Sequence, residues 1–161
     1  MPTPIDLQEV SACTCLRARR AARQLTRLYD SVLDPVGITA NQVGLLAKLL
    51  GASMRGQEGL SIGALADRVG MHPSTLNRDL KPLKALGFVT DASDPDDLRV
   101  RVVRITKKGE SKLRQAIPAW RRAQAQVQDA LGHEVMLSLN ALLDLASAKI
   151  AQYDPATIDS H

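Results

Sequence analysis

The side chains best suited to chemistry lie on one face of a helix that the sequence predicts from Pro73. At about 100° per residue, one side of this helix carries four leucines, Leu76, Leu80, Leu83 and Leu86. The opposite side carries Ser74, Thr75, Asn77, Arg78 and Lys81. Hydroxyls and amides can bond phosphate oxygens or base edges, and Arg can grip guanine through two hydrogen bonds. The pattern indicates either a nucleic-acid contact or the solvated face of an ordinary core helix.

The segment before Pro73 favours the nucleic-acid interpretation. Residues 62–70 form a short predicted helix with Ser61 as N-cap and Gly70 at its C-terminal end. A tight turn through His72 then leads to Pro73, which suits a first helical position. The result is a helix-turn-helix, the usual carrier of base contacts. His72 either contacts a phosphate or caps the second helix, and Pro82 should cost about 3 kcal/mol or bend that helix.

A basic hairpin follows the helix-turn-helix. Residues 88–90 and 99–105 are β-branched or aromatic runs, and the turn-rich, acidic loop 91–97 separates them. Arg99 and Arg101 can enter the minor groove of DNA, whose negative potential attracts Arg. Asp97 can bond the Arg99 guanidinium or a nearby backbone group and so hold the loop in shape. Taken alone, a charged hairpin is more often a protected sheet edge.

Helices account for most of the remaining chain. One long amphipathic helix is expected over residues 10–35, followed by a capping box at Thr39 and Gln42 and a helix that ends at a turn-rich stretch, 51–59. Residues 106–131 and the segment from 133 to Asp154 predict two more helices, the first bent or broken at Pro118. The fold class is therefore mainly α (α+β): a winged helix-turn-helix with a two-stranded β-hairpin wing and long N- and C-terminal helices.

Composition restricts the function classes. The chain has 161 residues, 21 Lys and Arg against 17 Asp and Glu, and a formal charge of +4, which permits a polyanionic partner. No signal peptide, membrane-length apolar run, phosphate loop, catalytic triad or metal-spaced cluster occurs in the sequence. We therefore expect a cytosolic protein that is not an enzyme, with no cofactor, no metal and no membrane partner.

Several motifs together resemble the MarR family of bacterial transcriptional regulators. They are Ser61–Ala66, Ser74–Leu80, Leu83–Val89, Asp94–Arg99 and Arg104–Gly109, with Asp97-x-Arg99 and Thr106-x-x-Gly109 the most diagnostic. The resemblance covers nearly the whole chain, including residues 37–42. It implies that Ser74, Thr75, Asn77, Arg78 and Lys81 match the family's recognition helix, and that Arg99 matches its wing-tip arginine.

The resemblance also implies an assembly and a mode of control. It implies a single domain over 1–161, in which helices at about 10–36 and 107–152 dimerise and residues 38–106 form the winged helix. The homodimer would bind a palindromic operator in double-stranded DNA as a repressor, and a small-molecule or oxidant effector would release it. The effector pocket would lie between the dimerisation helices and the winged helix, with Tyr29 and Trp120 as its candidate aromatic residues. A winged-helix module that binds protein instead of DNA is the alternative.

Cys13 and Cys15 are the only cysteines. Some proteins of this family sense oxidants or electrophiles through a cysteine near the N-terminus, which makes the pair a candidate redox site. On one continuous helix, residues two apart point about 200° apart, so both thiols could not face one partner. Buried, inert thiols are the alternative, and we favour it here.

Overall fold

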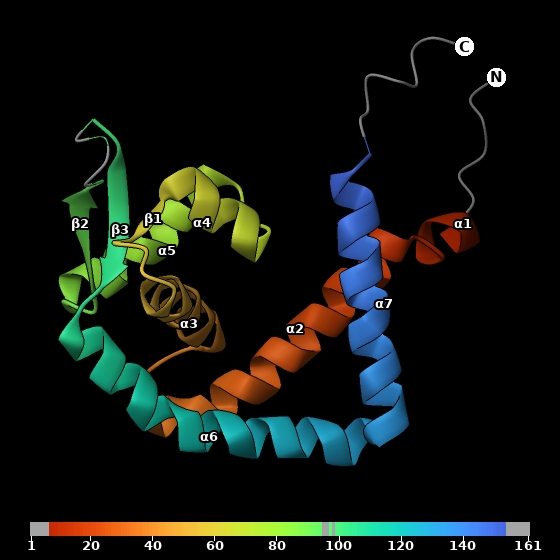
Figure 1. Cartoon of the computed structure of the whole chain (residues 1–161). Coiled ribbons are helices and arrows are strands. Elements are labelled where there is room, and N and C mark those ends of the chain that lie inside the picture. Colours follow the sequence, from red (N-terminus) through yellow and green to blue (C-terminus); the bar gives the residue numbers. More distant parts are fainter. Residues whose placement is uncertain (1–6, 95–96, 98, 154–161) are drawn as a thin grey trace, which may run out of the picture. The chain divides into compact units, whose positions relative to one another are not determined.

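In the computed structural model, residues 7–94, 97 and 99–153 are described (Figure 1). The helices are α1 (Leu7–Ser11), α2 (Thr14–Leu33), the 3-10 helix η1 (Asp34–Val36), α3 (Ala40–Met54), α4 (Ile62–Val69), α5 (Pro73–Ala85), α6 (Lys107–Leu131) and α7 (His133–Ala151). The strands are β1 (Leu60–Ser61), β2 (Val89–Ser93) and β3 (Arg101–Ile105). The mainly α winged-helix class predicted above is confirmed.

The chain divides into two compact units, Met1–Ala123 and Gln124–His161. The first holds the hydrophobic core, which Leu45, Leu46, Leu65, Leu76 and Leu80 fill with side chains at most 1% exposed. Within the described residues, the second unit consists of the C-terminal part of α6, from Gln124, and the whole of α7. None of the residues of α7 is buried. Within this unit the side-chain amide of Gln124 donates to Sδ of Met136.

The wing is a three-stranded antiparallel sheet of order β1-β3-β2, where a two-stranded hairpin was predicted. Leu60 pairs with Val103 on one side of β3, and Val89 pairs with Ile105 on the other. β2 extends to Ser93, so the first three residues of the expected loop 91–97 are strand, and Arg99 lies in a turn before β3. β1 was not predicted, because a segment of two residues is too short to show the alternation of apolar and polar residues. Leu60 and Ser61 form a strand only by pairing with Val103 and Val102 of β3.

Three helices differ from the predictions. The first helix is interrupted at Ala12 and Cys13, which separate α1 from α2. α3 continues past Gly51 to Met54, and the fully buried Ala52 explains why packing outweighs the roughly 1 kcal/mol cost of a helical glycine. α6 runs unbroken through Pro118, so a break there was wrong. α7 ends at Ala151, and Asp154 and Pro155, which should stop it, lie outside the described residues.

Local capping signals were predicted well. Thr39 and Gln42 form the complete capping box of α3, with Gln42 N to Thr39 Oγ1 at 3.3 Å and Thr39 N to Gln42 Oε1 at 3.1 Å. Ser61 Oγ accepts from the backbone N–H of Ala64, and Gly70 ends α4 with a φ of 65°. Such caps depend on residues within one turn, which is why the sequence suffices to predict them.

Candidate nucleic-acid interface

Helix α5 has two contrasting faces. Leu76, Leu80 and Leu83 are 0% exposed on its inner face and fix the helix in the core. The outer face is polar: Ser74, Asn77, Arg78 and Lys81 are exposed, and Thr75 at its edge is half-buried. The helix continues through Pro82 to Ala85, so the proline does not end it. The structure therefore places all five predicted side chains on one helix, four of them exposed.

The single acid of α5, Asp79, is turned away from the outer face. Its Oδ2 accepts a hydrogen bond of 2.8 Å from the side-chain amide of Asn41 on α3, and its side chain is only 26% exposed. Arg78 Nε lies 4.0 Å from its other carboxylate oxygen, yet the Arg78 side chain stays 77% exposed. The sequence analysis missed the Asn41–Asp79 contact. It attaches α5 to the N-terminal turn of α3 and leaves the outer face cationic.

The start of α5 is capped by His72. Its Nδ1 accepts from the backbone N–H of Ser74 at 3.3 Å and lies 2.8 Å from Ser74 Oγ. This is the capping role weighed in the sequence analysis, and the exposed ring remains accessible to a phosphate as well. The cap also draws the Ser74 hydroxyl towards the helix N-terminus, where the orphan N–H groups favour anions.

The wing tip is folded by its own carboxylates. Asp94 Oδ1 accepts from the backbone N–H of Asp97 at 3.4 Å, and Asp97 Oδ1 accepts from the backbone N–H of Arg99 at 3.0 Å. The same Asp97 oxygen lies 3.7 Å from Arg99 Nε. The Arg99 side chain is 96% exposed, and Arg101 is exposed at the start of β3. Two of the loop's acids therefore bond the tip backbone, and Arg99 projects into solvent.

Two contacts attach the wing to its neighbouring helices. Lys84 Nζ pairs with Asp91 at 2.7 Å and so links α5 to β2. Thr106 Oγ1 donates to the carbonyl of Gly87 at 2.6 Å and accepts from the backbone N–H of Gly109 at 3.1 Å. A Cβ on Gly109 would meet the carbonyl oxygen of Phe88 at 2.1 Å, so only glycine fits. The Thr106-x-x-Gly109 motif is thus the joint between the wing and α6.

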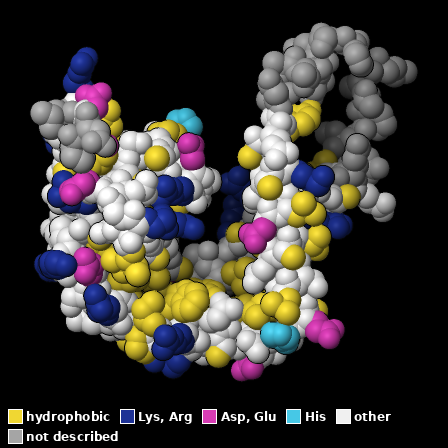
Figure 2. All heavy atoms as spheres, viewed as in Figure 1, with side chains coloured by type: hydrophobic (Ala, Val, Ile, Leu, Met, Phe, Trp, Pro, Cys, Tyr) yellow, Lys and Arg dark blue, Asp and Glu magenta, His cyan; other side chains and the backbone are white. Residues whose placement is uncertain are grey.

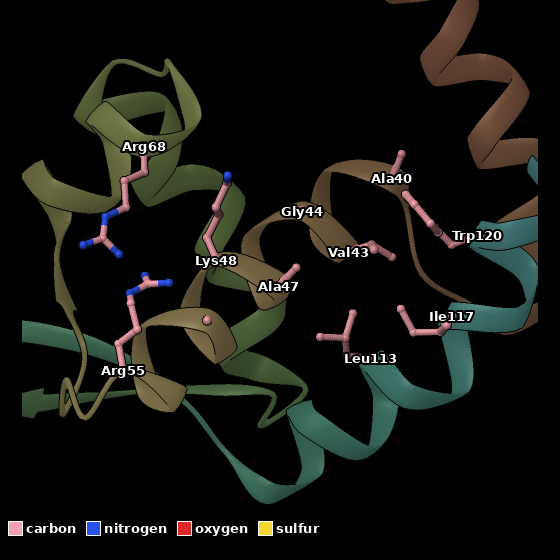
Figure 3. Close-up of a pocket in the computed structure, with 11 residues that line it drawn as sticks. Ala40, Val43, Gly44, Ala47, Lys48, Arg55, Arg68, Leu113, Ile117 and Trp120 are labelled. Atoms are coloured by element: carbon pink, nitrogen blue, oxygen red, sulfur yellow. The ribbon is translucent and has the colours of Figure 1, made fainter. Parts of the chain in front are cut away.

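A groove lies beside this module, between α3, α4 and α6 (Figure 3). It measures about 640 Å³, and Trp120 lines it. Tyr29 is not among the lining residues; its ring lies beside that of Trp120, with centroids 6.4 Å apart and an interplanar angle of 47°. Burial raises the pKa of Tyr29 above its ordinary value. The sequence analysis missed the other lining residues, although a stripe of small residues on α3 could have indicated them.

The two cysteines are exposed, contrary to the buried thiols we favoured. Cys13 is the N-cap of α2 with φ −55° and ψ 120°, outside the helix, whereas Cys15 lies in the first turn. The argument that the two thiols diverge on one continuous helix therefore does not hold. In the part of the chain that is described, no cluster of metal-ligating residues occurs and no helix has the length and apolar content to cross a membrane.

Comparison with known proteins shows which solved structures share this fold. No protein-family model and no curated protein matches the sequence. Among solved structures, the transcriptional regulator MosR from M. tuberculosis is 33% identical, with a TM-score of 0.69 over 85% of this chain and 97% of MosR. A structure of MosR in complex with DNA matches at 34% identity and a TM-score of 0.68, over 84% of this chain and 97% of that one.

More distant structures share the fold. A mutant MarR from E. coli in complex with operator DNA gives a TM-score of 0.74 at 21% identity, over 88% of this chain and 99% of that one. CouR from Rhodococcus jostii RHA1, bound to p-coumaroyl-CoA, gives 0.69 at 18% identity, over 85% and 93%. With a helix-turn-helix, a basic wing and a relative one-third identical over nearly its whole length, this chain belongs to the MarR family of DNA-binding transcriptional regulators.

Proposed function

We propose that this chain acts as a homodimeric repressor whose α5 enters the major groove of an operator while Arg99 of the wing holds the minor groove or the backbone. The observation that carries the proposal is the outer face of α5, where Ser74, Asn77, Arg78 and Lys81 are exposed and the only acid is turned onto α3. Exposed apolar residues would instead be expected if this face bound protein.

The exposed apolar surface supports a homodimer. Leu142 and Ile150 of α7 are 63% and 72% exposed, and Leu7 and Leu16 near the N-terminus are 73% and 50% exposed. Figure 2 shows hydrophobic side chains along α7. Val135, Leu139, Leu142, Ala146 and Ile150 recur at intervals of three or four residues, which places them along one face. A second copy would cover this face and supply a second α5 for the other half-site.

The test is binding to the DNA upstream of the protein's own gene. We expect fluorescence anisotropy or gel shift to detect a complex that weakens steeply with salt, because Lys and Arg displace counterions from phosphates. Arg78→Ala should reduce the affinity by about 1 to 3 kcal/mol, and Arg122→Ala, an equally charged change on α6, should not. If the protein binds none of the DNA fragments, or if Arg78→Ala and Arg122→Ala lose the same affinity for DNA, the assignment of α5 is refuted. As such a regulator the protein would work in the cytosol and catalyse no reaction.

Oxidant control is a second candidate, favoured by the exposed thiols on either side of the α2 N-terminus. Hydrogen peroxide would oxidise one thiol to a sulfenic acid with release of water. The second thiol would then displace a second water and form a Cys13–Cys15 disulfide. Because Cys15 lies in the first helical turn, that bond would require the start of α2 to rearrange. Peroxide should release the wild type from DNA but not Cys13→Ser or Cys15→Ser, and equal release of all three would eliminate this control.

A further inference from the structure

Helix α2 carries the whole net positive charge of the chain. Of the 21 Lys and Arg, five lie on this helix, and of the 17 Asp and Glu only Asp30 does, so the remaining 16 of each sign cancel. All five of its cations are arginines. They are exposed, and none forms a salt bridge within the described residues: Arg17, Arg19, Arg20, Arg23 and Arg27.

The five arginines share one side of the helix, which we call the arginine face. At about 100° per residue they fall within about 160° of one another, and between Arg17 and Arg27 only Gln24 lies among them. The other side carries Ala18 and Leu25. The apolar side can therefore pack against protein while the arginine face stays accessible to a partner.

The charges on α2 do not serve the stability of the helix. Residues three or four apart are neighbours on a helix surface, and three such pairs repel one another: Arg17–Arg20, Arg20–Arg23 and Arg23–Arg27. The first turn contains no acid, and Asp30 lies in the last turn, where the helix macrodipole disfavours a negative charge. A face kept only for solubility would mix both signs of charge. A bound polyanion would relieve the repulsion between the arginines.

A hollow of about 500 Å³ lies between the end of α1 and the first turns of α2. Arg17 and Arg20 line it, together with Ser11, Ala21 and Gln24, and none of these described lining residues is acidic. The guanidinium and amide N–H groups donate hydrogen bonds, and a planar guanidinium can bind two phosphate oxygens at once. The hollow therefore suits a phosphate group.

We infer that the arginine face of α2 binds the phosphate backbone of double-stranded DNA without reading its sequence, at a surface separate from α5 and the wing. This goes beyond the proposed function, in which α5 and Arg99 hold the operator. Contacts between arginine and phosphate need only the regular charge of the duplex. Once α5 has bound DNA, neighbouring DNA is present at a high effective concentration, which makes it the polyanion that α2 meets.

The course of α2 separates this surface from the operator contacts. Its C-terminal end is attached to α3, because Asp30 Oδ1 accepts from the backbone N–H of Ala40 at 2.7 Å. From there α2 runs away from α4, α5 and the wing sheet (Figure 1). The arginines in its N-terminal half therefore contact a DNA segment other than the one bound by α5, and the protein would hold two segments at once.

Two other occupants fit the arginine face less well. A helix that lies on a membrane inserts large apolar side chains, whereas the apolar side of α2 is rich in alanine over residues 18–22. In a second copy of the chain, α7 offers two acids, Glu134 and Asp144, for five arginines. Asp144 lies about 180° around α7 from Val135, away from the apolar face that another copy would cover.

The first test is binding to a duplex whose sequence is unrelated to the operator. The α2 double variant, Arg20→Gln with Arg23→Gln, should bind it at least about tenfold more weakly, and the slope of log affinity against log salt should fall by about 1.8, or about 0.9 for each lost phosphate contact. The α6 double variant, Arg121→Gln with Arg122→Gln, loses the same charge at exposed positions and should bind like the wild type. Equal binding by the two double variants would overturn the inference.

A charge-keeping variant separates electrostatics from folding. Arg20→Lys with Arg23→Lys retains both positive charges and should keep the salt slope of the wild type. Circular dichroism and analytical ultracentrifugation show whether each variant is folded and in the same assembly as the wild type. If the charge-keeping variant is folded and loses the slope, charge on α2 is not what binds DNA, and the inference is overturned.

Chemical protection tests the same surface in the wild type, without any variant. Phenylglyoxal modifies accessible guanidinium groups, and mass spectrometry of the peptides locates the modification. Arg20 and Arg23 should react in the free protein and with one operator duplex per dimer, and an added unrelated duplex should protect them. Arginines already protected in the free protein would be paired with a second copy. Protection by vesicles of phosphatidylglycerol and phosphatidylcholine, but not by DNA, would assign a membrane. Either result would overturn the inference.

The operator contact and the arginine face can fail separately. If Arg78→Ala leaves operator binding unchanged while the α2 double variant loses unrelated DNA, the arginine face stands and the assignment of α5 fails. If operator binding depends on Arg78 while unrelated DNA protects neither Arg20 nor Arg23, the proposed repressor stands and the inference about α2 is overturned.

Discussion

Helices α5 and α7 both carry an apolar face, and the two faces are covered differently. In α5 the leucines at 76, 80 and 83 are completely buried by the rest of the chain, and the polar face is left free. In α7 no residue is buried, and Leu142, Leu145 and Ile150 are more than half exposed. The winged-helix module thus completes its core within one chain, whereas the apolar face of α7 stays exposed. The stability of the winged-helix module should therefore not depend on protein concentration. Any role of α7 in assembly should depend on it.

The largest expected effect breaks the α7 side of this comparison. Leu142→Asp places a charge on the exposed apolar face, where a dimer interface would have to bury it without a partner. We expect loss of the dimer in analytical ultracentrifugation at micromolar concentration, and with it loss of operator binding. Asn140→Asp adds the same charge two residues away, on the opposite side of the helix, and should remain dimeric. A dimeric Leu142→Asp variant would show that α7 is not the interface.

The next effect concerns the α5 side. Leu80→Ala removes a side chain that is 0% exposed, and such cavities cost about 2 to 5 kcal/mol of the free energy of unfolding. Leu86→Ala changes the same residue type where it is 46% exposed, at the C-cap of α5, and should cost less than about 1 kcal/mol. Urea titrations of both variants give the difference. Equal losses would mean that α5 is not fixed by its leucine face.

A third prediction separates binding from folding in the wing. Arg99→Ala should weaken operator binding by about 1 to 3 kcal/mol, because the side chain is 96% exposed and projects from a tip held by Asp97. Thermal unfolding should be unchanged, since the side chain has no part in the core. An unaltered dissociation constant for DNA would refute the contact assigned to the wing tip.

The contrast between α5 and α7 also explains what the sequence could predict. The helix-turn-helix and the caps at Thr39 and Ser61 depend on residues within a few positions of one another, and these predictions hold. β1 does not follow from local pattern, because Leu60 becomes strand only by pairing with Val103. The end of α3 was misplaced because burial of Ala52 is a tertiary effect.

The candidate sites likewise include one that local sequence pattern predicts and one that it does not. The outer face of α5 could be listed from helical periodicity, and its residues lie where expected. The groove could not, because it is defined by small side chains on α3 and by cations from two helices, Lys48 and Arg55 on one and Arg68 on the other. Trp120 was identified as an aromatic candidate, whereas its cationic counterparts at the far end come from separate elements that only the fold brings together.

The smallest expected effect sharpens the comparison, because it should change one region and leave the other unaltered. Thr39→Ala removes the side chain that caps α3 and should reduce the free energy of unfolding by about 1 kcal/mol, whereas Thr39→Ser keeps the hydroxyl and should cost less. Since this cap lies within the module that completes its own core, the dimer dissociation constant should stay the same in both variants. A weakened dimer in Thr39→Ala would mean that the two regions are energetically coupled, and α7 could then no longer be treated as a separate assembly element.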